Sequence, residues 1–312
     1  MEFGKLPDIE GINFSLPPDP PQNDYLWQRL STQQRLPGRL HVGCTQWGRT
    51  DWVGKVYPKG TKQKDFLAHY VKQFNCIELN TLFYSLQPKS VIGRWASLAG
   101  DGFRFCPKMP ESISHTLQLK NAQQETEVFI DHLSAFGDRL GTSFLQLSES
   151  FGPGRAAILA DYLHQLPGDF QLCLELRHKD WFAPPGTPHL PLDSAVKDIY
   201  ALLLEQNIGT VITDTAGRRD VLHMRLTAPV VFIRWIGNSL HPTDLTRIEA
   251  WAHRIRSWMD KGMQDIYFIV HNHNEWYAPD LARLAVERFN AICGTSLLPP
   301  KLTITPPPLT LF

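Results

Sequence analysis

Two short segments of this sequence place charged side chains inside what otherwise look like buried strands. In LCLELRHKDWF (172–182), leucines alternate with a cysteine, Glu175 and Arg177. CIELN (76–80) places Glu78 between an isoleucine and a leucine in the same way. Because successive side chains of a strand point to opposite faces, the charged groups face away from the leucines. An enclosed carboxylate has its pKa raised toward neutrality and can transfer protons, and arginine binds phosphate or carboxylate bidentately, so the pattern predicts a site for an anionic ligand.

The same alternation applies to polar residues at or just past the ends of the other predicted strands. Parallel strands that close into a barrel bring their carboxyl ends to one mouth, where barrel proteins build their sites. The residues expected to converge there are Glu78, Lys108, Gln146, Glu175, Arg177, Asp214, Arg234 and Asn272. A satisfied ionic network without chemistry would contain the same balance of three acids and three bases, so both interpretations stay open.

The strands that carry these residues recur at a regular interval along the chain. Apolar runs of strand length are RLHVG (39–43), CIELN (76–80), FRFCP (103–107), TSFLQL (142–147), QLCLEL (171–176), TVITD (210–214), VVFIRW (230–235) and DIYFIV (265–270). Helical periodicity lies between them at 65–74, 90–99, 125–136, 155–166, 196–207 and 244–262. The gap TAGRRDVLHMRLTAP between the sixth and seventh runs is short, so we expect a loop there in place of a full helix.

Eight strands with intervening helices predict an α/β fold of the TIM (β/α)₈ barrel type, as a single domain. An open doubly wound sheet would be expected to carry a glycine-rich phosphate turn after its first strand, but VGCTQWG contains no G-x-G-x-x-G. Proline-rich segments flank the barrel. We therefore expect an N-terminal extension at 1–37, the barrel at 38–294 and a C-terminal tail at 295–312.

Composition narrows the classes of protein that the chain can belong to. Its 312 residues are 43% hydrophobic and 20% charged, which favours a large buried core. Lys plus Arg and Asp plus Glu both number 31, which argues against a surface built wholly for nucleic acid. No apolar run approaches the roughly 20 residues of a membrane helix, and the first residues do not resemble a secretory signal. The 5 cysteines form no C-x-x-C pair and are interpreted as buried hydrophobes, so we expect a cytoplasmic protein.

Several longer motifs resemble a known family. VGCTQWGRTDWVGKVYP, FNCIELNTLFYSL, DGFRFCPKMPESISH, LGTSFLQLSESFGPG and LELRHKDWF resemble, in this order, motifs of the domain-of-unknown-function family 72, also called YecE-like. The resemblance spans about residues 39–285 and implies a TIM barrel, but it implies no reaction. It suggests a pocket near Trp47, Glu78, Asn80, Tyr84, Lys108, His115, Gln146, Glu175, Arg177, His178, Trp181, Asp214, Arg234 and Asn272. The chain departs from the family pattern after the eighth strand, where it reads VHNHNEWYAP.

The first functional hypothesis is an enzyme, a hydrolase or an isomerase, that acts on a small phosphorylated or otherwise anionic ligand or a nucleotide. Lys108, Arg177 and Arg234 would hold the anion. Amides such as Gln146 and Asn272 would orient the ligand. The candidate acid/base residues are Glu78, Glu175 and Asp214.

Two alternatives belong to other classes. A metal-dependent phosphodiesterase or nuclease would use the same three carboxylates, with His178 or His271 as further ligands, although three cations in the mouth would repel a metal ion. A non-catalytic nucleic-acid-binding module would use a loop that mixes bases with aromatics. The residues of that loop are Trp47, Arg49, Trp52, Lys55, Tyr57, Lys59, Lys62 and Lys64. The sequence names no cofactor and no oligomeric state.

Overall fold

The structure, a computed structural model, describes residues 3–34, 36–182 and 193–303. Parallel strands form one sheet of 8 strands in the order β3-β2-β1-β8-β7-β6-β5-β4. They are β1 Arg39–Cys44, β2 Cys76–Leu79, β3 Arg104–Pro107, β4 Ser143–Gln146, β5 Leu172–Glu175, β6 Gly209–Asp214, β7 Val230–Gly237 and β8 Asp265–Asn272. Bridges between Phe105 and Leu140 and between Lys108 and Phe144 join β3 to β4, so the sheet closes into a nearly complete barrel. The predicted TIM-barrel fold is confirmed.

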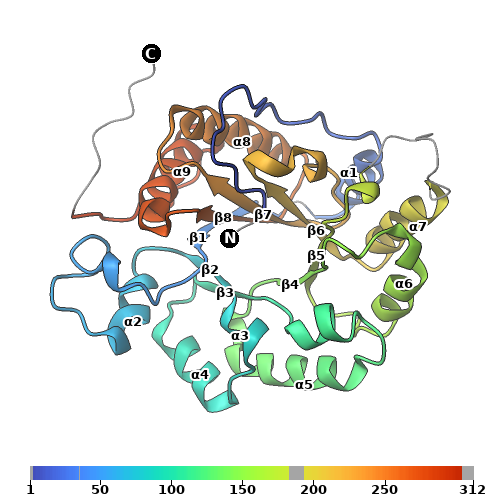
Figure 1. Ribbon diagram of the computed structural model, residues 1–312, viewed down its shortest axis with the longest axis horizontal. Coiled ribbons are helices and arrows are strands. Elements are labelled where there is room, and N and C mark those ends of the chain that lie inside the picture. The colour runs from blue at the N-terminus through green and yellow to red at the C-terminus, as the bar shows by residue number, and fades with distance from the viewer. Residues whose placement is uncertain (1–2, 35, 183–192, 304–312) are drawn as a thin grey trace.

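Helices surround the barrel, as Figure 1 shows. The described helices are α1 Asn23–Ser31, α2 Phe66–Tyr70, α3 Thr81–Tyr84, α4 Lys89–Leu98, α5 Gln123–Leu133, α6 Ala156–His164, α7 Asp193–Glu205, α8 Pro242–Asp260 and α9 Ala278–Cys293. The segment 215–229 contains a 3₁₀ turn at Ala216–Val221 and no α-helix, as expected from its length. None of the helices in the described ranges is long and apolar enough to cross a membrane.

The side-chain alternation that the sequence predicted holds in β5. Leu172 and Leu174 pack in the large core between strands and helices, whereas Cys173 lies in a separate cluster in the barrel interior. The other members of the interior cluster are Cys76, Cys106, Phe144, Val211, Phe232, Tyr267 and Ile269. All 5 cysteines are free thiols and are buried, as small hydrophobic residues are. The layer of apolar side chains closes the barrel below the mouth, so polar residues above it form the floor of any site.

Helix α8 shows how the outer layer is fixed. It begins where the His241 side chain accepts the N–H of Thr243, with proline in the first turn. Its buried stripe consists of Ile248, Trp251, Ile255 and Trp258, all 0% exposed. These residues recur at helical spacing, so the stripe is core-facing, as predicted.

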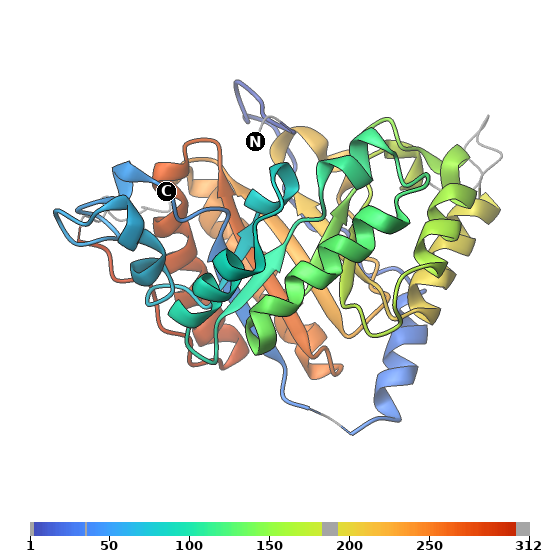
Figure 2. The same ribbon diagram turned by 90° about the horizontal axis from the view of Figure 1, so that it is seen from below.

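The N-terminal extension crosses the outside of the barrel from the carboxyl to the amino ends of the strands. The Phe3 ring lies 4.2 Å from the Arg177 guanidinium, which follows β5, and Figures 1 and 2 place this end of the chain over the mouth. Helix α1 lies at the opposite end, where buried Asn23 donates to the carbonyl of Met224 (2.7 Å) and accepts the N–H of Leu226 (2.9 Å). The described part of the extension is therefore docked on the barrel near both ends.

The C-terminal tail is also docked as far as it is described. The N–H of Lys301 donates to Oε1 of Gln73 (2.8 Å), and that of Thr303 donates to the carbonyl of Lys55 (2.9 Å). Residues 304–312, which include the last proline run, lie outside the described residues.

Candidate functional site

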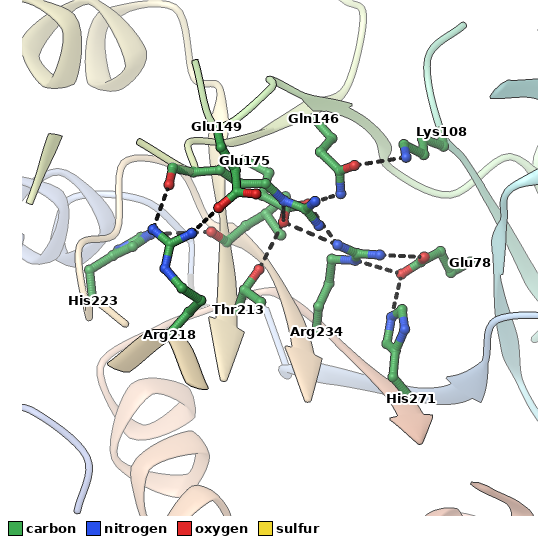
Figure 3. Close-up of polar contacts among 12 residues, drawn as sticks. Glu78, Lys108, Gln146, Glu149, Glu175, Thr213, Arg218, His223, Arg234 and His271 are labelled. Atoms are coloured by element: carbon green, nitrogen blue, oxygen red, sulfur yellow. Dashed lines mark hydrogen bonds and ion pairs between the residues drawn. The ribbon is translucent and has the colours of Figure 1, made fainter. Parts of the chain in front are cut away.

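Arg234 links two carboxylates across the barrel mouth. From β7, its Nε and Nη2 donate to the two oxygens of Glu78 at the end of β2, both at 2.9 Å. Its Nη1 donates to both oxygens of Glu175 at the end of β5, at 3.1 and 2.9 Å. Figure 3 shows the guanidinium between the two acids. At most 2% of any of these residues is exposed, and each of the three guanidinium nitrogens of Arg234 already donates to a carboxylate.

Glu78 has further partners that keep it ionised. Nε2 of His271, on β8, lies 2.9 Å from its Oε2, and Nδ2 of Asn80 donates to its Oε1 at 2.9 Å. Burial alone raises the pKa of this carboxyl, but Arg234 and His271 outweigh burial and hold the pKa well below its ordinary value. Burial lowers the pKa of His271, so the ring is neutral near pH 7 and donates its N–H to the carboxylate.

Glu175 is held in the same state by a different set of donors. It accepts from Nε of Arg177 (2.7 Å), Nε2 of Gln146 (2.7 Å) and Oγ1 of Thr213 (3.0 Å), in addition to Arg234. Burial opposes ionisation, but the two arginines and the amide lower the pKa to about 2. The expectation that the enclosed mouth raises the pKa of Glu78 and Glu175 toward neutrality is wrong, because cations in direct contact outweigh the loss of solvation.

A cavity of about 650 Å³ opens above this network. Its polar lining includes Glu78, Asn80, Lys108, Gln146, Arg177, Arg234, His271 and Glu275. Trp47, Tyr84 and Trp95 also line it, and the rings of Trp47 and Trp95 meet edge to face at 5.4 Å. The cavity is therefore lined by both charged and aromatic side chains.

Arg177 presents its guanidinium to this cavity. Its Nε is bound to Glu175, and the Phe3 ring covers one face of the group. Within the described residues, no hydrogen bond occupies its two terminal nitrogens. A guanidinium that is bound through Nε and stacked on one face can still donate from its two terminal nitrogens to two oxygens of a carboxylate or phosphate.

Lys108 is the second cation of the cavity and lies just past β3. Its Nζ donates to Oε1 of Gln146 (2.8 Å) and lies 3.6 Å from the centre of the Phe83 ring. No carboxylate of the described residues lies within ion-pair distance of it. Burial, reinforced by the charge of Arg234, lowers the pKa of Lys108 to about 7.

Two residues that the sequence assigned to the mouth lie elsewhere. Thr213 takes the interior direction at the end of β6, so the carboxylate of Asp214 points outward to Arg247 of α8, 3.1 Å away. On β8, His271 faces the interior, and the side chain of Asn272 points outward to the Ser239 loop. The prediction that Asp214 and Asn272 lie in the mouth is wrong. In each strand the preceding residue, Thr213 or His271, faces the interior instead.

Three predicted residues lie near the mouth but outside the cavity lining, as far as the described residues go. His115 packs edge to face on Phe83 at 5.4 Å. His178 accepts the N–H of Asp180 and so caps a 3₁₀ turn. Trp181 is 1% exposed and donates its indole N–H to the carbonyl of Phe151 at 2.7 Å, which makes it part of the core.

Glu275 lines the cavity, and sequence reasoning missed it. Burial raises the pKa of its carboxyl to about 7. It lies in VHNHNEWYAP, the segment in which the chain departs from the family pattern, and that departure was the signal that could have found it. Thr213 and Trp95 were also missed, because nothing in their types or spacing distinguishes them from ordinary strand and helix residues.

The structure bears on both alternative sites of the sequence analysis. Among the described residues, no group of three or more His, Cys, Asp or Glu is placed to hold a metal ion. In the basic and aromatic loop, Lys55 is 1% exposed and paired with Asp280, while Trp52 and Tyr57 are 0% and 1% exposed. These three side chains hold the loop on the barrel and are not available to a nucleic acid.

Comparisons with known proteins agree with the fold. Residues 41–302 match the family described as "Protein of unknown function DUF72". UPF0759 protein YecE of Escherichia coli (strain K12) is 27% identical over 252 residues, which cover 78% of this chain and 89% of that protein. A DUF72 family protein of Enterococcus faecalis has the same fold, with a TM-score of 0.64 at 18% identity over 84% of this chain and 98% of that one. A DUF72 family protein of Thermotoga maritima has a TM-score of 0.61 at 19% identity, over 82% of this chain and 99% of that one. The chain belongs to the DUF72 family of proteins of unknown function.

Proposed function

We propose that the barrel mouth binds a small anionic ligand, such as a phosphorylated metabolite or a nucleotide. The observation that carries this proposal is the pair of cations that face the cavity, Arg177 and Lys108, neither of which is neutralised in full by the network below. Arg177 would take two oxygens of the anion through its terminal nitrogens, and Lys108 would add a point charge. Arg234 does not bind the ligand in this account, because each of its three guanidinium nitrogens already donates to Glu78 or Glu175.

The rest of the cavity suits the uncharged part of such a ligand. Its volume of about 650 Å³ lies within the range of small-molecule sites, which is roughly 300–1,000 Å³. The rings of Trp47, Trp95 and Tyr84 offer flat surfaces on which a base or sugar ring can pack. Tyr84 is 76% exposed, which leaves its ring accessible at the rim.

Any acid/base step in this mouth is assigned to Glu275. Glu78 and Glu175 have lowered pKa values and full sets of donors, so they remain carboxylates that position Arg234 and Arg177. Glu275, whose pKa is about 7, exists in both protonation states near neutral pH. A general acid or base works best in that range.

Isothermal titration calorimetry with inorganic phosphate tests the proposal. Arg177→Lys keeps the charge but loses the fork, so we expect phosphate affinity to fall roughly 10- to 100-fold, about the value of one charge-assisted hydrogen bond. Arg94→Gln, on the exposed side of α4, is the matched control and should bind like the wild type. Equal affinity in wild type and Arg177→Lys, or no binding to the wild type, would contradict the proposal.

A further inference from the structure

The surroundings of Lys108 differ from those of a lysine that serves only as a charge. The residue is 7% exposed, and its Nζ is bound to a neutral amide oxygen of Gln146 and to the face of Phe83. Arg234 and Arg177 face it with positive charge, and Glu175 and Glu78 face it with negative charge. Both acids are in contact with Arg234, which leaves little of their charge for the lysine. His115 is a further titratable neighbour, and burial lowers the pKa of its ring, which favours the neutral form.

This environment destabilises the ammonium ion of Lys108 relative to that of an exposed lysine, so both the cation and the free amine are populated near neutral pH. Burial removes solvent from the charged form, and Arg234 repels it. Because the resulting pKa is about 7, a large fraction of Lys108 carries a lone pair at neutral pH, whereas an ordinary lysine carries almost none. Desolvation beside other cations is a known way in which proteins make a lysine nucleophilic.

The amine is also oriented. Nε2 of Gln146 donates to Oε2 of Glu175 at 2.7 Å, which fixes the amide so that its oxygen faces Lys108. One N–H of the neutral amine is directed to that oxygen and the other can lie on the Phe83 ring, which leaves the remaining tetrahedral direction for the lone pair. Lys108 lines the same cavity as Arg177, so an anion bound at Arg177 shares this cavity with the amine.

We propose that Lys108 forms an imine with a small aldehyde or ketone that carries a carboxylate or phosphate, and that Arg177 holds the anionic group. This inference rests on the proposed anion site and names its ligand class. The lysine nitrogen attacks the carbonyl carbon to form a C–N bond. The carbonyl oxygen then leaves as water with the two hydrogens of the amine, so the step needs no oxidant, reductant or co-reactant. Where the carbon next to the new C=N bond carries hydrogen, as in pyruvate or dihydroxyacetone phosphate, the bond makes that carbon acidic, and Glu275 is the group we assign to accept the proton.

Reductive trapping tests the inference on the full chain. The protein is incubated near pH 7.5 with glyoxylate, pyruvate or dihydroxyacetone phosphate in the presence of cyanoborohydride, which reduces imines to stable secondary amines. Peptide mapping by mass spectrometry then locates the adducts. We expect the peptide with Lys108 to be labelled at least roughly tenfold faster than that with exposed Lys62, because burial lowers the pKa of Lys108 to about 7 and the amine faces the anion site. Lys108→Met should abolish this label, and Lys62→Arg should leave it unchanged.

The outcomes separate this inference from the anion site. If phosphate binds through Arg177 but none of the three probes labels Lys108 faster than Lys62 in the wild-type chain, the imine is overturned and the anion site stands. If phosphate does not bind, the anion site fails and the inference fails with it. Equal labelling of wild type and Arg177→Lys at limiting probe would also overturn the inference, because Arg177 would then not hold the anion.

Discussion

At the scale of single residues, the mouth is organised around Arg234. A guanidinium between Glu78 and Glu175 costs solvation on all three groups, and it is tolerated because every charged atom has a hydrogen-bond partner. In the network below the cavity, Arg234 and its two carboxylates therefore have a structural role, and the ligand-binding role falls to residues beside them. Within the described residues, Arg177 has no hydrogen bond on its two terminal nitrogens, and Lys108 has no carboxylate partner. These two residues can therefore bind a ligand.

Arg234→Met tests the structural centre. The change leaves two buried carboxylates without their main cation, so the free energy of unfolding should fall by about 3–5 kcal/mol at pH 7. Urea unfolding followed by circular dichroism measures it. Arg94→Gln should change it by less than about 0.5 kcal/mol, as surface changes do. A loss below about 1 kcal/mol in Arg234→Met would show that the bridge does not hold the mouth together.

Glu175 makes the stability depend on pH in a defined direction. Its pKa is about 2 in the folded protein against an ordinary value of 4.5, so its stabilising contribution is present above pH 4.5 and is lost as the pH falls toward 2. Urea titrations at several pH values should show the gap in unfolding free energy between wild type and Glu175→Gln closing over that interval. A gap that stays constant from pH 7 to the acid end would contradict the ionised state of Glu175.

At the scale of elements, the outward turn at the end of β6 separates Asp214 from the site. Its carboxylate binds Arg219, Arg247 and the indole N–H of Trp251 (2.7 Å) and so ties β6 to α8. We expect Asp214→Asn to lower the free energy of unfolding by about 3 kcal/mol, because two arginines lose a buried partner. Calorimetry with phosphate should give the wild-type affinity. A large loss of phosphate affinity would contradict the placement of Asp214 outside the site.

The strands also show what the sequence could and could not predict. In β2, β3 and β5, polar residues and cysteines alternate with large apolar ones, so the face of Glu78, Lys108 and Glu175 could be predicted. β6 and β8 carry apolar residues on both faces, as buried parallel strands do, so alternation there does not show which face points to the interior. The assignments of Asp214 and Asn272 failed for that reason, and each missed by one residue.

At the scale of the whole molecule, the N-terminal extension connects both ends of the barrel. Its prolines and weak periodicity hid α1, whose buried side consists of Asn23, Leu26 and Leu30. α9 was missed although Leu281, Ala285 and Phe289 recur at helical spacing in the sequence and are all 0% exposed. The barrel itself could be predicted from the regular recurrence of strands. The docking position of the extension could not be predicted, because it depends on single contacts such as that of Asn23 with the carbonyl of Met224.

Phe3 is the point at which this extension reaches the site. Its ring stacks on Arg177 and lies 4.7 Å from Arg218, which restricts the guanidinium without occupying its terminal nitrogens. Phe3→Ala removes a cation–π contact of about 0.5–1 kcal/mol and frees the side chain to move, so phosphate affinity should fall about 2- to 5-fold. Calorimetry is the measurement, with Tyr25→Ala, an exposed aromatic on α1, as the control. Tighter binding would mean that Phe3 obstructs the site.

The central claim is that Arg177 and Lys108 form an anion site above a neutralised network, and a crystal structure with inorganic phosphate tests it most directly. The account predicts a phosphate whose oxygens lie about 2.7–2.9 Å from the terminal nitrogens of Arg177, with a further oxygen facing Nζ of Lys108. It also predicts that Arg234 keeps its contacts with Glu78 and Glu175. A phosphate bound to Arg234 in place of a carboxylate, or an empty mouth at saturating phosphate, would contradict the account.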